Sequence, residues 1–491
     1  MSLFFGINIA VKGMMAQQVA MDVASHNIAN ANTEGYSRQR VNLETSAPIS
    51  GLTAAGQLGS GVDIAEVTRV RDSFLDYQLR KESSSLEYET AISDTLSQVE
   101  TVFMEPSETG FNEELEDFWN NWQELSKSPE SSPVRTALKE ASTSLTDTLR
   151  QMHDQLSAIN SDVQSQIEIK IEDVNSIAER IAQLNEEIVD VKIAGDNPND
   201  LLDARDLVLD DLAAIGNIAI SNSLDVNGKP TGAISVKLGN ITVVDDSAAI
   251  AISSDDVDST TVTGGALAGL LQVGGDSNES NTIQFYIKKL DTLAVGIAKS
   301  INDIHTTGTD LDGNSGGDYF VFKDADGNEI ELSAVDWDNP FASGLSAGNI
   351  YLNSDIQNDV STIAAAKQDS IFLEGNGEIA LQIAKLKDVY LEYDAVNQVL
   401  QNSISGDLTI GMFYQGMITS LGSATSEAEK MVDNQQALVD HTTSRRESIQ
   451  GVSADEEMAN IVLFQHAFNA SAKVISVMDE MLDTIINGLK A

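Results

Sequence analysis

The chain has 491 residues, of which 29 are basic and 76 acidic, so its formal net charge is −47. The length predicts two to four domains, and the charge excludes a surface built to hold nucleic-acid phosphates or an anionic membrane, because both would repel it. The absence of cysteine excludes disulfide bonds, thiolate zinc sites and cysteine nucleophiles. An acidic surface suits solubility, a salty exterior or a basic partner, and charge alone does not choose among these.

An apolar stripe predicts a helix at the N-terminal end. Ile7, Met14, Met21 and Ile28 recur every seven residues, and Ala10, Val11 and Ala24 fill positions between them on the same side. The stripe then meets a stretch rich in asparagine with a glycine at 35, which favours a helix stop and a turn. From the residues alone an ordinary helix end explains this stretch. No basic residue precedes the apolar run at 3–11, so we expect no cleaved signal peptide, and no stretch approaches the ~20 apolar residues of a membrane span.

The next 160 or so residues predict helices after a short extended segment. Residues 36–70 are turn-rich and extended, and a helix follows over about 72–103. A short amphipathic helix at 111–125 places Phe118 and Trp122 on a face typical of core packing. Pro133 can open a helix that runs to Ala194, roughly 90 Å at 1.5 Å per residue. Its four-three apolar rhythm changes to two steps of four at 163–171, which resembles a stutter.

The middle of the chain changes from helix to strand and back. Asn199 or Asp200 is expected to cap a helix that ends near Ile215, and residues 217–275 alternate as β-hairpins. A helix is expected at 282–305. Residues 308–355 are rich in glycine, aspartate and asparagine and predict a small loop-and-strand element. Further helices are expected at about 378–402 and 409–449.

The C-terminal helix carries the most regular apolar pattern in the chain. Ser453 and Glu456 form a capping box ahead of it. One side of the helix alternates in steps of three and four, with the polar Ser471 as one member and apolar residues at Ile461, Phe464, Phe468, Ile475, Met478, Leu482, Ile485 and Leu489. A second stripe beside it contains Ala467, Ala470, Val474, Val477 and Met481.

Three motifs with possible chemistry favour structural explanations. Residues 344–348 match G-x-S-x-G, but a strand rather than a helix is expected after them, which favours a glycine-rich turn over a nucleophile elbow. Residues 310–314 and 324–328 resemble the first half of a calcium loop, yet both lack its glycine at position six and its closing glutamate. Asp-Gly turns explain them better. The five histidines are scattered, with no metal-ligand spacing.

The two terminal stripes predict contacts on more than one side. Termini fray unless they are held, so regular apolar faces at both ends are expected to be buried. The ends can pair within one subunit as a two-helix coiled coil. The stronger hypothesis adds burial against neighbouring subunits, because head-to-tail contacts that repeat produce rings or helical assemblies. That second contact would explain the second stripe.

The string NIANANTEGYSRQRV, residues 27–41, resembles the N-terminal signature of the bacterial flagellar axial proteins, the family of rod, hook and hook-associated subunits. Within that family GYSRQ is most similar to the hook–filament junction members. His26 departs from the pattern, where asparagine is expected. The stretch LLDARDLVLDDL and the C-terminal GVSADEEMANIVLFQHAFNASAKVI also resemble the junction members, whereas residues 217–355 resemble them weakly.

The resemblance implies a non-enzymatic structural subunit without cofactor, metal or nucleic acid. It implies export from the cytoplasm on an uncleaved N-terminal signal and a place outside the cell, at the junction of hook and filament. The implied partners are copies of the same chain, the hook protein, the next hook-associated protein and a cytosolic export chaperone at the C-terminal helix. The residues expected at the subunit interface are the two terminal stripes, Ile7 to Ile28 and Ile461 to Leu489, together with Asn27, Asn30, Thr33, Gly35 and Tyr36.

The sequence therefore predicts a mainly α protein with a smaller β part. We expect a terminal helical domain of 1–70 with 450–491, a long-helix bundle of 71–310 with 355–449 that carries hairpins at 217–275, and a small insertion at 311–354. Two alternatives remain open at this point. One is a hook or rod subunit, against which the long helices argue, and the other is a secreted coiled-coil adhesin or effector.

Overall fold

The chain divides into two compact units, each described by itself. In this computed structural model, unit 1 comprises Met1–Glu87, Lys170–Ala268 and Asp433–Ala491, and unit 2 comprises Tyr88–Ile169 and Gly269–Val432. The residues that the structure describes are 3–50, 57–103, 110–277, 279–368, 375–394, 399–402 and 406–488.

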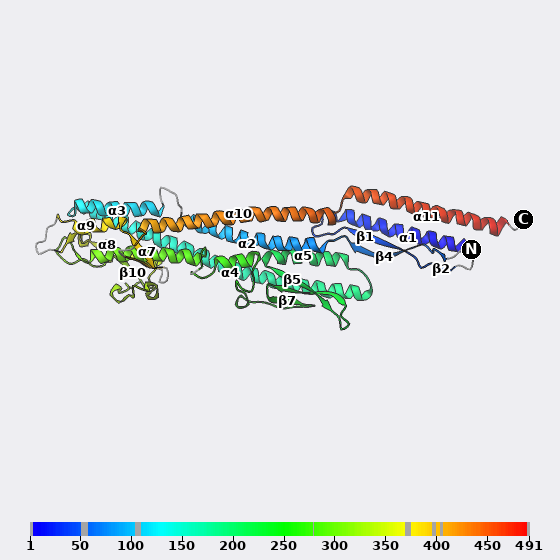
Figure 1. Ribbon diagram of the computed structural model, residues 1–491, viewed down its shortest axis with the longest axis horizontal. Coiled ribbons are helices and arrows are strands. Elements are labelled where there is room, and N and C mark those ends of the chain that lie inside the picture. The colour runs from blue at the N-terminus through cyan, green and yellow to red at the C-terminus, as the bar shows by residue number, and fades with distance from the viewer. Residues whose placement is uncertain are drawn as a thin grey trace. The chain divides into compact units, whose positions relative to one another are not determined.

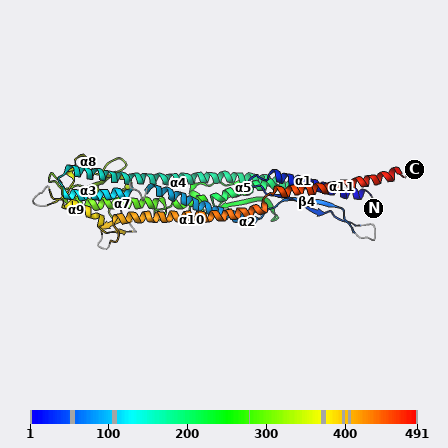
Figure 2. The same cartoon turned by 90° about the horizontal axis from the view of Figure 1, so that it is seen from above.

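The terminal helices of unit 1 lie side by side. Helix α1 (Leu3–Ala29) packs along helix α11 (Ala454–Gly488), as Figures 1 and 2 both show. After the turn that ends α1, an antiparallel ribbon of β1 (Gln39–Thr45) and β4 (Val62–Arg69) packs on α1. The ribbon continues into a two-residue pair of strands, β2 (Ile49–Ser50) and β3 (Gln57–Leu58). The predicted extended segment is confirmed over its described residues.

Unit 1 also contains helix α5 (Asn199–Ile215) and a four-stranded antiparallel sheet in the order β5-β6-β7-β8. The strands are β5 (Ile218–Leu224), β6 (Pro230–Leu238), β7 (Ile241–Asp245) and β8 (Ala248–Ala249). Gly228 and Gly239 have positive φ, +76° and +56°, in the two hairpin turns that the sequence predicts. At Gly239 any side chain would also collide with the backbone around Thr261.

Three long helices contribute residues to both units. They are α2 (Ser73–Phe103), α4 (Ser132–Ala194) and α10 (Ile410–Gln450). All three match the predicted ranges to within one or two residues. In α4 the apolar positions of the four-three rhythm are buried except Ile159, which is half-buried, and Val163, Ile167 and Ile171 of the predicted stutter are buried as well. The helix therefore keeps one apolar side over its 63 residues.

Unit 2 packs short helices and small two-stranded sheets around a cluster of aromatic rings. Trp122 is fully buried between Phe118, Tyr319 and His305. The other helices of unit 2 are α3 (Phe111–Lys127), α7 (Ile283–His305), α8 (Ser354–Asn358) and α9 (Glu378–Ala384). Helix α6 (Gly265–Val273) begins in unit 1 and ends in unit 2. The paired strands are β9 (Gly308–Thr309) with β12 (Ala366–Lys367), β10 (Phe320–Phe322) with β11 (Ile350–Leu352), and β13 (Leu391–Asp394) with β14 (Val399–Asn402).

Three expectations about elements are wrong. The helix expected at 378–402 ends at Ala384, and 391–402 contains a strand pair, because Val389-Tyr390-Leu391 begins a run with strand preference. The β region expected to reach 275 ends at Ala249, and the short apolar run at 265–273 is helix α6. Asn199 and Asp200 lie inside α5 and do not cap it, because their side chains bond to Val67 and Gln39 instead.

The predicted fold class, mainly α with a smaller β part, is confirmed. The finer division into three domains stays a prediction.

Candidate assembly site

Glycine and alanine let the two terminal helices approach closely. A Cβ added to Gly6 would lie 2.5 Å from Cε of Met478, and one added to Gly13 would lie 3.3 Å from Oγ of Ser471. Residues early in α1 thus face residues late in α11, so the helices run antiparallel. Among the residues of α1 whose burial is described, 4–29, the buried apolar ones are all alanines, namely Ala10, Ala16, Ala20 and Ala24. The small residues form the centre of the contact.

The predicted stripes lie beside this centre. Ile7, Met14, Met21 and Ile28 are half-buried along the border of the contact. On α11 the half-buried residues include Ile461, Phe464, Phe468, Ile475, Met478 and Leu482. Ile485 is exposed, and Leu489 lies outside the described residues. The structure therefore brings the two stripes together within one chain, while their contact with other subunits stays a prediction.

The second stripe of α11 is only partly covered by the described residues of the chain. Val474, Val477 and Met481 are 42–45% exposed, and Leu463 is 62% exposed on the same side. Ala470 is exposed and Ala467 half-buried. An exposed apolar stripe of this length on a charged chain is typical of a surface that another molecule covers.

Asn27 locks the turn that follows α1. Its side-chain oxygen accepts hydrogen bonds from the Tyr36 hydroxyl at 2.8 Å and from the Gln39 amide at 2.9 Å. Its amide donates to the Gln39 carbonyl at 2.9 Å and to Oε2 of Glu457 at 3.2 Å. Burial, followed by the nearby carboxylates of Asp200, Asp203 and Glu457, raises the pKa of Tyr36. The hydroxyl therefore stays protonated and donates to Asn27.

The other predicted turn residues also bond locally. The Asn30 amide donates to the His26 carbonyl, and the Thr33 hydroxyl donates to Oδ1 of Asn30. Gly35 has φ +75°, as the sequence predicts for a left-handed turn position. A Cβ there would also lie 3.2 Å from Cβ of Leu207. These residues shape the turn, and any additional role at a subunit contact stays a prediction.

Arg38 ties the turn to the start of α11. Its Nε lies 2.8 Å from Oε1 of Glu457 and its Nη1 lies 3.3 Å from Oε2 of Glu456. The Arg38 backbone amide donates to the carbonyl of Gln450, the last residue of α10. The capping box is therefore only half formed: the Glu456 amide donates to the Ser453 hydroxyl at 3.4 Å, but the Glu456 carboxylate binds Arg38.

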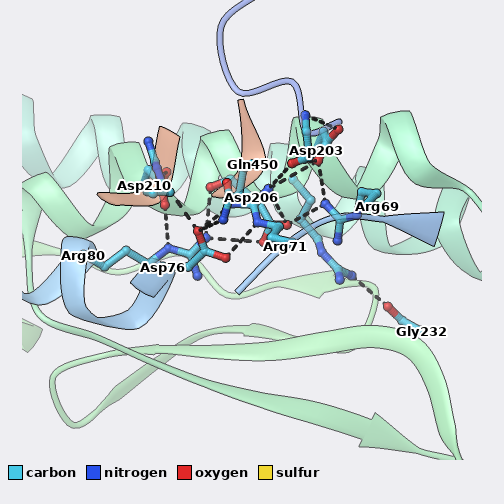
Figure 3. A network of polar contacts seen from close by, with 12 residues as sticks. Arg69, Arg71, Asp76, Arg80, Asp203, Asp206, Asp210, Gly232 and Gln450 are labelled. Carbon is cyan, nitrogen blue, oxygen red and sulfur yellow. Dashed lines mark hydrogen bonds and ion pairs between the residues drawn. The ribbon is translucent and has the colours of Figure 1, made fainter. Parts of the chain in front are cut away.

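A network of arginines and aspartates joins four segments of unit 1 (Figure 3). Asp203 accepts hydrogen bonds from Arg69 at 2.7 Å and from the Ser37 hydroxyl at 2.7 Å. Arg71 binds Asp76 at 2.8 Å and lies 3.1 Å from Asp206.

The network extends from α2 to the end of α10. Arg80 donates from Nε to Asp210 at 2.6 Å, and Arg446 binds the other oxygen of Asp210 at 2.7 Å. Gln450 donates to Asp76 at 3.2 Å. The three motifs that resemble the flagellar family, near residues 36, 203 and 451, thus meet around one polar cluster.

The cluster keeps its partly buried aspartates and arginines ionised. Burial opposes ionisation of Asp206, yet Arg71, Arg69 and Arg80 together lower its pKa. Burial likewise opposes the charge on Arg71, and Asp206, Asp76 and Asp203 outweigh it and raise its pKa. Arg205, whose Nη1 donates to the carbonyl of Gly232 and to Asn185, has its pKa lowered to about 10 by burial.

Sequence reasoning missed this network. It noted LLDARDLVLDDL only as a stretch similar to the family. A usable signal was present, because Arg69, Arg71 and Arg80 are closely spaced cations in a chain with 76 acidic residues. Their partners on α5 lie 126–137 residues further along, which sequence spacing does not reveal.

The motifs with possible chemistry have structural roles in unit 2. Ser346 begins a single 3-10 turn, where its amide and hydroxyl both donate to Oδ1 of Asn349, and strand β11 follows directly. This is the expected turn and lacks the helix of a nucleophile elbow. Asp310 and Asp324 each accept two backbone amides of their own turn. Within the described residues no group of three or more metal-binding side chains occurs.

One helical stretch differs from the expectation that nothing approaches a membrane span. Among the described residues, Ile410–Ile486 contains an 18-residue window that is long and apolar enough to cross a membrane, judged by length and composition only. None of that window is buried. The expectation counted uninterrupted apolar residues and so missed a window with scattered polar positions.

Comparisons with known proteins identify the class. A family model described as "Flagella basal body rod protein" matches residues 7–36, and "Flagellar basal body rod FlgEFG protein C-terminal" matches 446–488. These matches cover α1 with its turn and α11 with its connection to α10. Both ends of the chain are therefore similar to the ends of flagellar basal body rod proteins.

The matches along the rest of the chain are more specific. A model of the "Flagellar hook-associated protein FlgK helical domain" matches residues 96–320. Flagellar hook-associated protein 1 of Bacillus subtilis is 30% identical over 99% of both chains, and that of Salmonella typhimurium is 25% identical over 98% of this chain and 99% of the relative. The chain belongs to the flagellar hook-associated protein 1 family. This is a family of flagellar structural proteins, and the protein is not an enzyme.

A solved structure supports the fold. The flagellar hook junction protein FlgK of Burkholderia pseudomallei matches with a TM-score of 0.59 and 16% identity, over 76% of this chain and 100% of that one. At that identity the likeness establishes the fold alone.

Proposed function

We propose that the protein is a structural subunit at the junction between hook and filament of the bacterial flagellum. The names of its relatives and of the matching solved structure support this position. In this proposal the chain contacts copies of itself, the hook protein on one side and the next hook-associated protein on the other. The α1–α11 pair packs in coiled-coil fashion against the corresponding helices of neighbouring subunits.

The uncovered stripe on α11 is the observation that carries the proposal. The pair of helices buries one apolar side of α11 against α1 and leaves Leu463, Val474 and Val477 in solvent. A subunit that functioned alone would gain nothing from that exposure. A subunit surrounded by like helices covers the stripe and recovers the free energy of burying it, ~25 cal/mol per Å².

The same surface explains two steps before assembly. We propose that the chain leaves the cytoplasm through the flagellar export apparatus on an uncleaved N-terminal signal. An exposed apolar stripe would cause aggregation in the cytoplasm, so a chaperone that covers the C-terminal helix until export is physically sensible. Lipid is a poor cover for this helix, because the charged side chains of Lys473 and Glu480 are exposed along α11.

A pair of matched variants of the full chain tests the stripe. Val477→Asp with Met481→Asp places two carboxylates on the exposed stripe, and Asn469→Asp with Ser476→Asp adds the same charge on the polar side of the helix. We expect cells that express only the stripe variant to lose their filaments, whereas the control variant supports normal numbers. Circular dichroism of both purified chains checks that helix content is kept. Normal filaments on the stripe variant would contradict the proposal.

Removal of residues 453–491 is the larger perturbation. We expect a soluble helical protein that neither joins the hook nor binds the export chaperone.

Hydrogen exchange on the full-length monomer provides a second test, which compares the exchange rates of residues 3–45 and 453–488 with those of residues 72–215. Faster exchange at the ends supports assembly-coupled ordering, and equal protection would argue that the ends are already fully packed in the monomer.

A further inference from the structure

The four-stranded sheet of unit 1 has two very different edges. Strand β8 has two residues and follows Asp245 and Asp246, so it offers little backbone for pairing. Strand β5 has seven residues, IAISNSL, with no charge and no proline, and among the described strands it pairs only with β6. Natural proteins protect edge strands with charge, proline or short length, so an unprotected edge indicates a strand that becomes paired.

A groove runs along this open edge. It has a volume of about 930 Å³, with Asn217 and the first three residues of β5 on one wall and the start of α2 on the other. Tyr77 of α2 is 65% exposed and Ile220 is 40% exposed, so apolar surface flanks the open backbone. The groove can hold an extended segment that adds backbone hydrogen bonds to β5 and apolar contacts to Tyr77.

The charge of the groove is opposite to that of the chain. Its charged lining residues are four cations, Arg69, Arg71, Arg80 and Lys81, and two carboxylates, Asp76 and Asp206. The arginines pair with aspartates of the polar network, but within the described residues Lys81 makes no ion pair. In a chain of net charge −47, this surface attracts an acidic segment.

The chain itself carries a segment of that kind. Between Arg40 and Arg69 at its ends, the β1–β4 ribbon contains Glu44, Asp63 and Glu66 and no lysine or arginine. The outer edges of this ribbon are unpaired among the described strands. Leu43 and Ile64 stand opposite each other on it and are 44% and 37% exposed. A two-stranded ribbon is marginal in water, and a third strand stabilises it.

We propose that the β5 groove of one copy receives the β1–β4 ribbon of a second copy as an added strand. The contact is heterologous, because groove and ribbon are different surfaces, and it therefore suits a ring or helical assembly. It rests on the proposed self-assembly, since a monomer has no second copy to supply the ribbon.

Cysteine pairs test the contact directly, because the chain has no cysteine of its own. Ser221→Cys is combined with Thr45→Cys for the β1 edge or with Ala65→Cys for the β4 edge. In flagella from cells that express only the variant, mild oxidation should give dimers with one of the two double variants and with neither partner alone. Dimers from Ser221→Cys alone would indicate β5–β5 pairing and overturn the ribbon as occupant. Assembled filaments without cross-links in either double variant would overturn the contact itself.

A charge swap provides an independent test if the cysteines disturb the strands. Lys81→Glu should lower the number of filaments per cell about fivefold, the equivalent of ~1 kcal/mol for a surface ion pair. Adding Glu44→Lys should restore it. Lys229→Glu, at an exposed hairpin turn of the same sheet, changes the net charge equally and should have no effect. Equal effects of Lys81→Glu and Lys229→Glu, or no rescue, would contradict the pairing.

The two proposals fail in different ways. If the α11 stripe variant abolishes filaments but the cross-links and the charge swap have no effect, the subunit assembles without the strand contact. If the stripe variant assembles normally, the proposed function itself is wrong.

Discussion

Helices α7 and α11 carry similar apolar repeats in very different surroundings. In α7 the side chains of Leu290, Ile297 and Ile301 are fully buried. Among the described residues of α11 with a known exposure, only Glu457 is buried, and no apolar side chain is. The same apolar pattern is therefore fully buried in the core of unit 2 and remains partly exposed on the surface of unit 1. Periodicity identifies a helix that needs cover, and only the structure shows whether the chain provides that cover.

The two units also use their cations differently. In unit 2 the lysines of α7 lie over aromatic rings: Lys288 over Phe341 at 3.1 Å and Lys299 over Trp337 at 4.5 Å from the ring centre. In unit 1 the arginines bind aspartates in a partly buried network. Unit 2 is thus held by apolar and aromatic contacts, and unit 1 depends more on ion pairs, which respond to pH and to loss of a partner.

The largest expected effect is the loss of the aromatic centre of unit 2. Trp122→Ala removes a fully buried ring and should lower the free energy of unfolding of unit 2 by about 4 kcal/mol. All three tryptophans, Trp119, Trp122 and Trp337, belong to unit 2, so fluorescence of the remaining two during urea unfolding reports this unit alone. Tyr390→Ala serves as the control, because this ring in the same unit is 51% exposed. It should change the free energy of unfolding of unit 2 only slightly.

The corresponding change in unit 1 breaks its ionic network. Asp206→Asn leaves Arg69, Arg71 and Arg80 with one carboxylate fewer and should cost about 3 kcal/mol, because partly buried cations lose their partner. Hydrogen exchange over 69–80 and 200–215 should quicken. Asp211→Asn is a matched control, since burial and the nearby Asp210 raise the pKa of Asp211 and its charge is unfavourable. Equal effects of both changes would contradict a specific network.

Two buried groups, His305 and Asp291, change the stability of unit 2 with pH in opposite directions. Burial lowers the pKa of His305 to about 4, so its contribution to stability is complete above pH 6.5 and is lost as the pH falls towards 4. Burial raises the pKa of Asp291 to about 6, so the folded state binds its proton more tightly and gains stability as the pH falls from 6 towards 3.8. In the native chain the two effects offset each other.

Single variants separate these contributions. Asp291→Asn keeps an acceptor for the Ala347 amide and should leave a unit that loses about 3 kcal/mol between pH 6.5 and 4. His305→Gln removes the histidine that must be protonated at low pH. The free energy of unfolding of that variant should therefore increase as the pH falls from 6.5 to 4. Urea unfolding followed by tryptophan fluorescence at pH 7, 5.5 and 4 measures both. Parallel pH profiles of the two variants would show that neither group titrates as described.

Much of the fold follows from the sequence because long helices repeat their signal many times. The predicted range of α4 matches the structure at both ends to within a residue, since Pro133 and Gly195 bound a continuous apolar rhythm. The short runs at 265–273 and 389–402 were predicted wrongly, because a few apolar residues fit a helix or a strand equally well. Long helices average over their residues, and short elements depend on neighbours that the sequence does not show.

The candidate site was predicted less completely than the fold. The terminal stripes pointed to the α1–α11 contact, and the sequence pattern placed Ala10 and Ala24 on the side of the α1 stripe. The pattern did not include Ala16 and Ala20, which are also buried at the centre of the contact. The partners of Asn27 were also unforeseeable, because Glu457 lies 430 residues away. Contacts between distant segments depend on the finished fold, so residue types alone do not specify them.

The smallest expected effect on stability comes from truncating an exposed side chain of α11, and it can be compared directly with the same kind of truncation in the buried helix α7. Val477→Ala on the exposed stripe should change the free energy of unfolding of the isolated chain by less than ~0.5 kcal/mol, because that side chain is 42% exposed and little contact is lost. Ile297→Ala at a fully buried position of α7 should cost ~2–5 kcal/mol. If Val477→Ala nevertheless lowers filament numbers while the monomer keeps its stability, the missing cover of α11 is supplied by other subunits. A stability loss comparable to that of Ile297→Ala would instead mean that the stripe is already packed in the monomer.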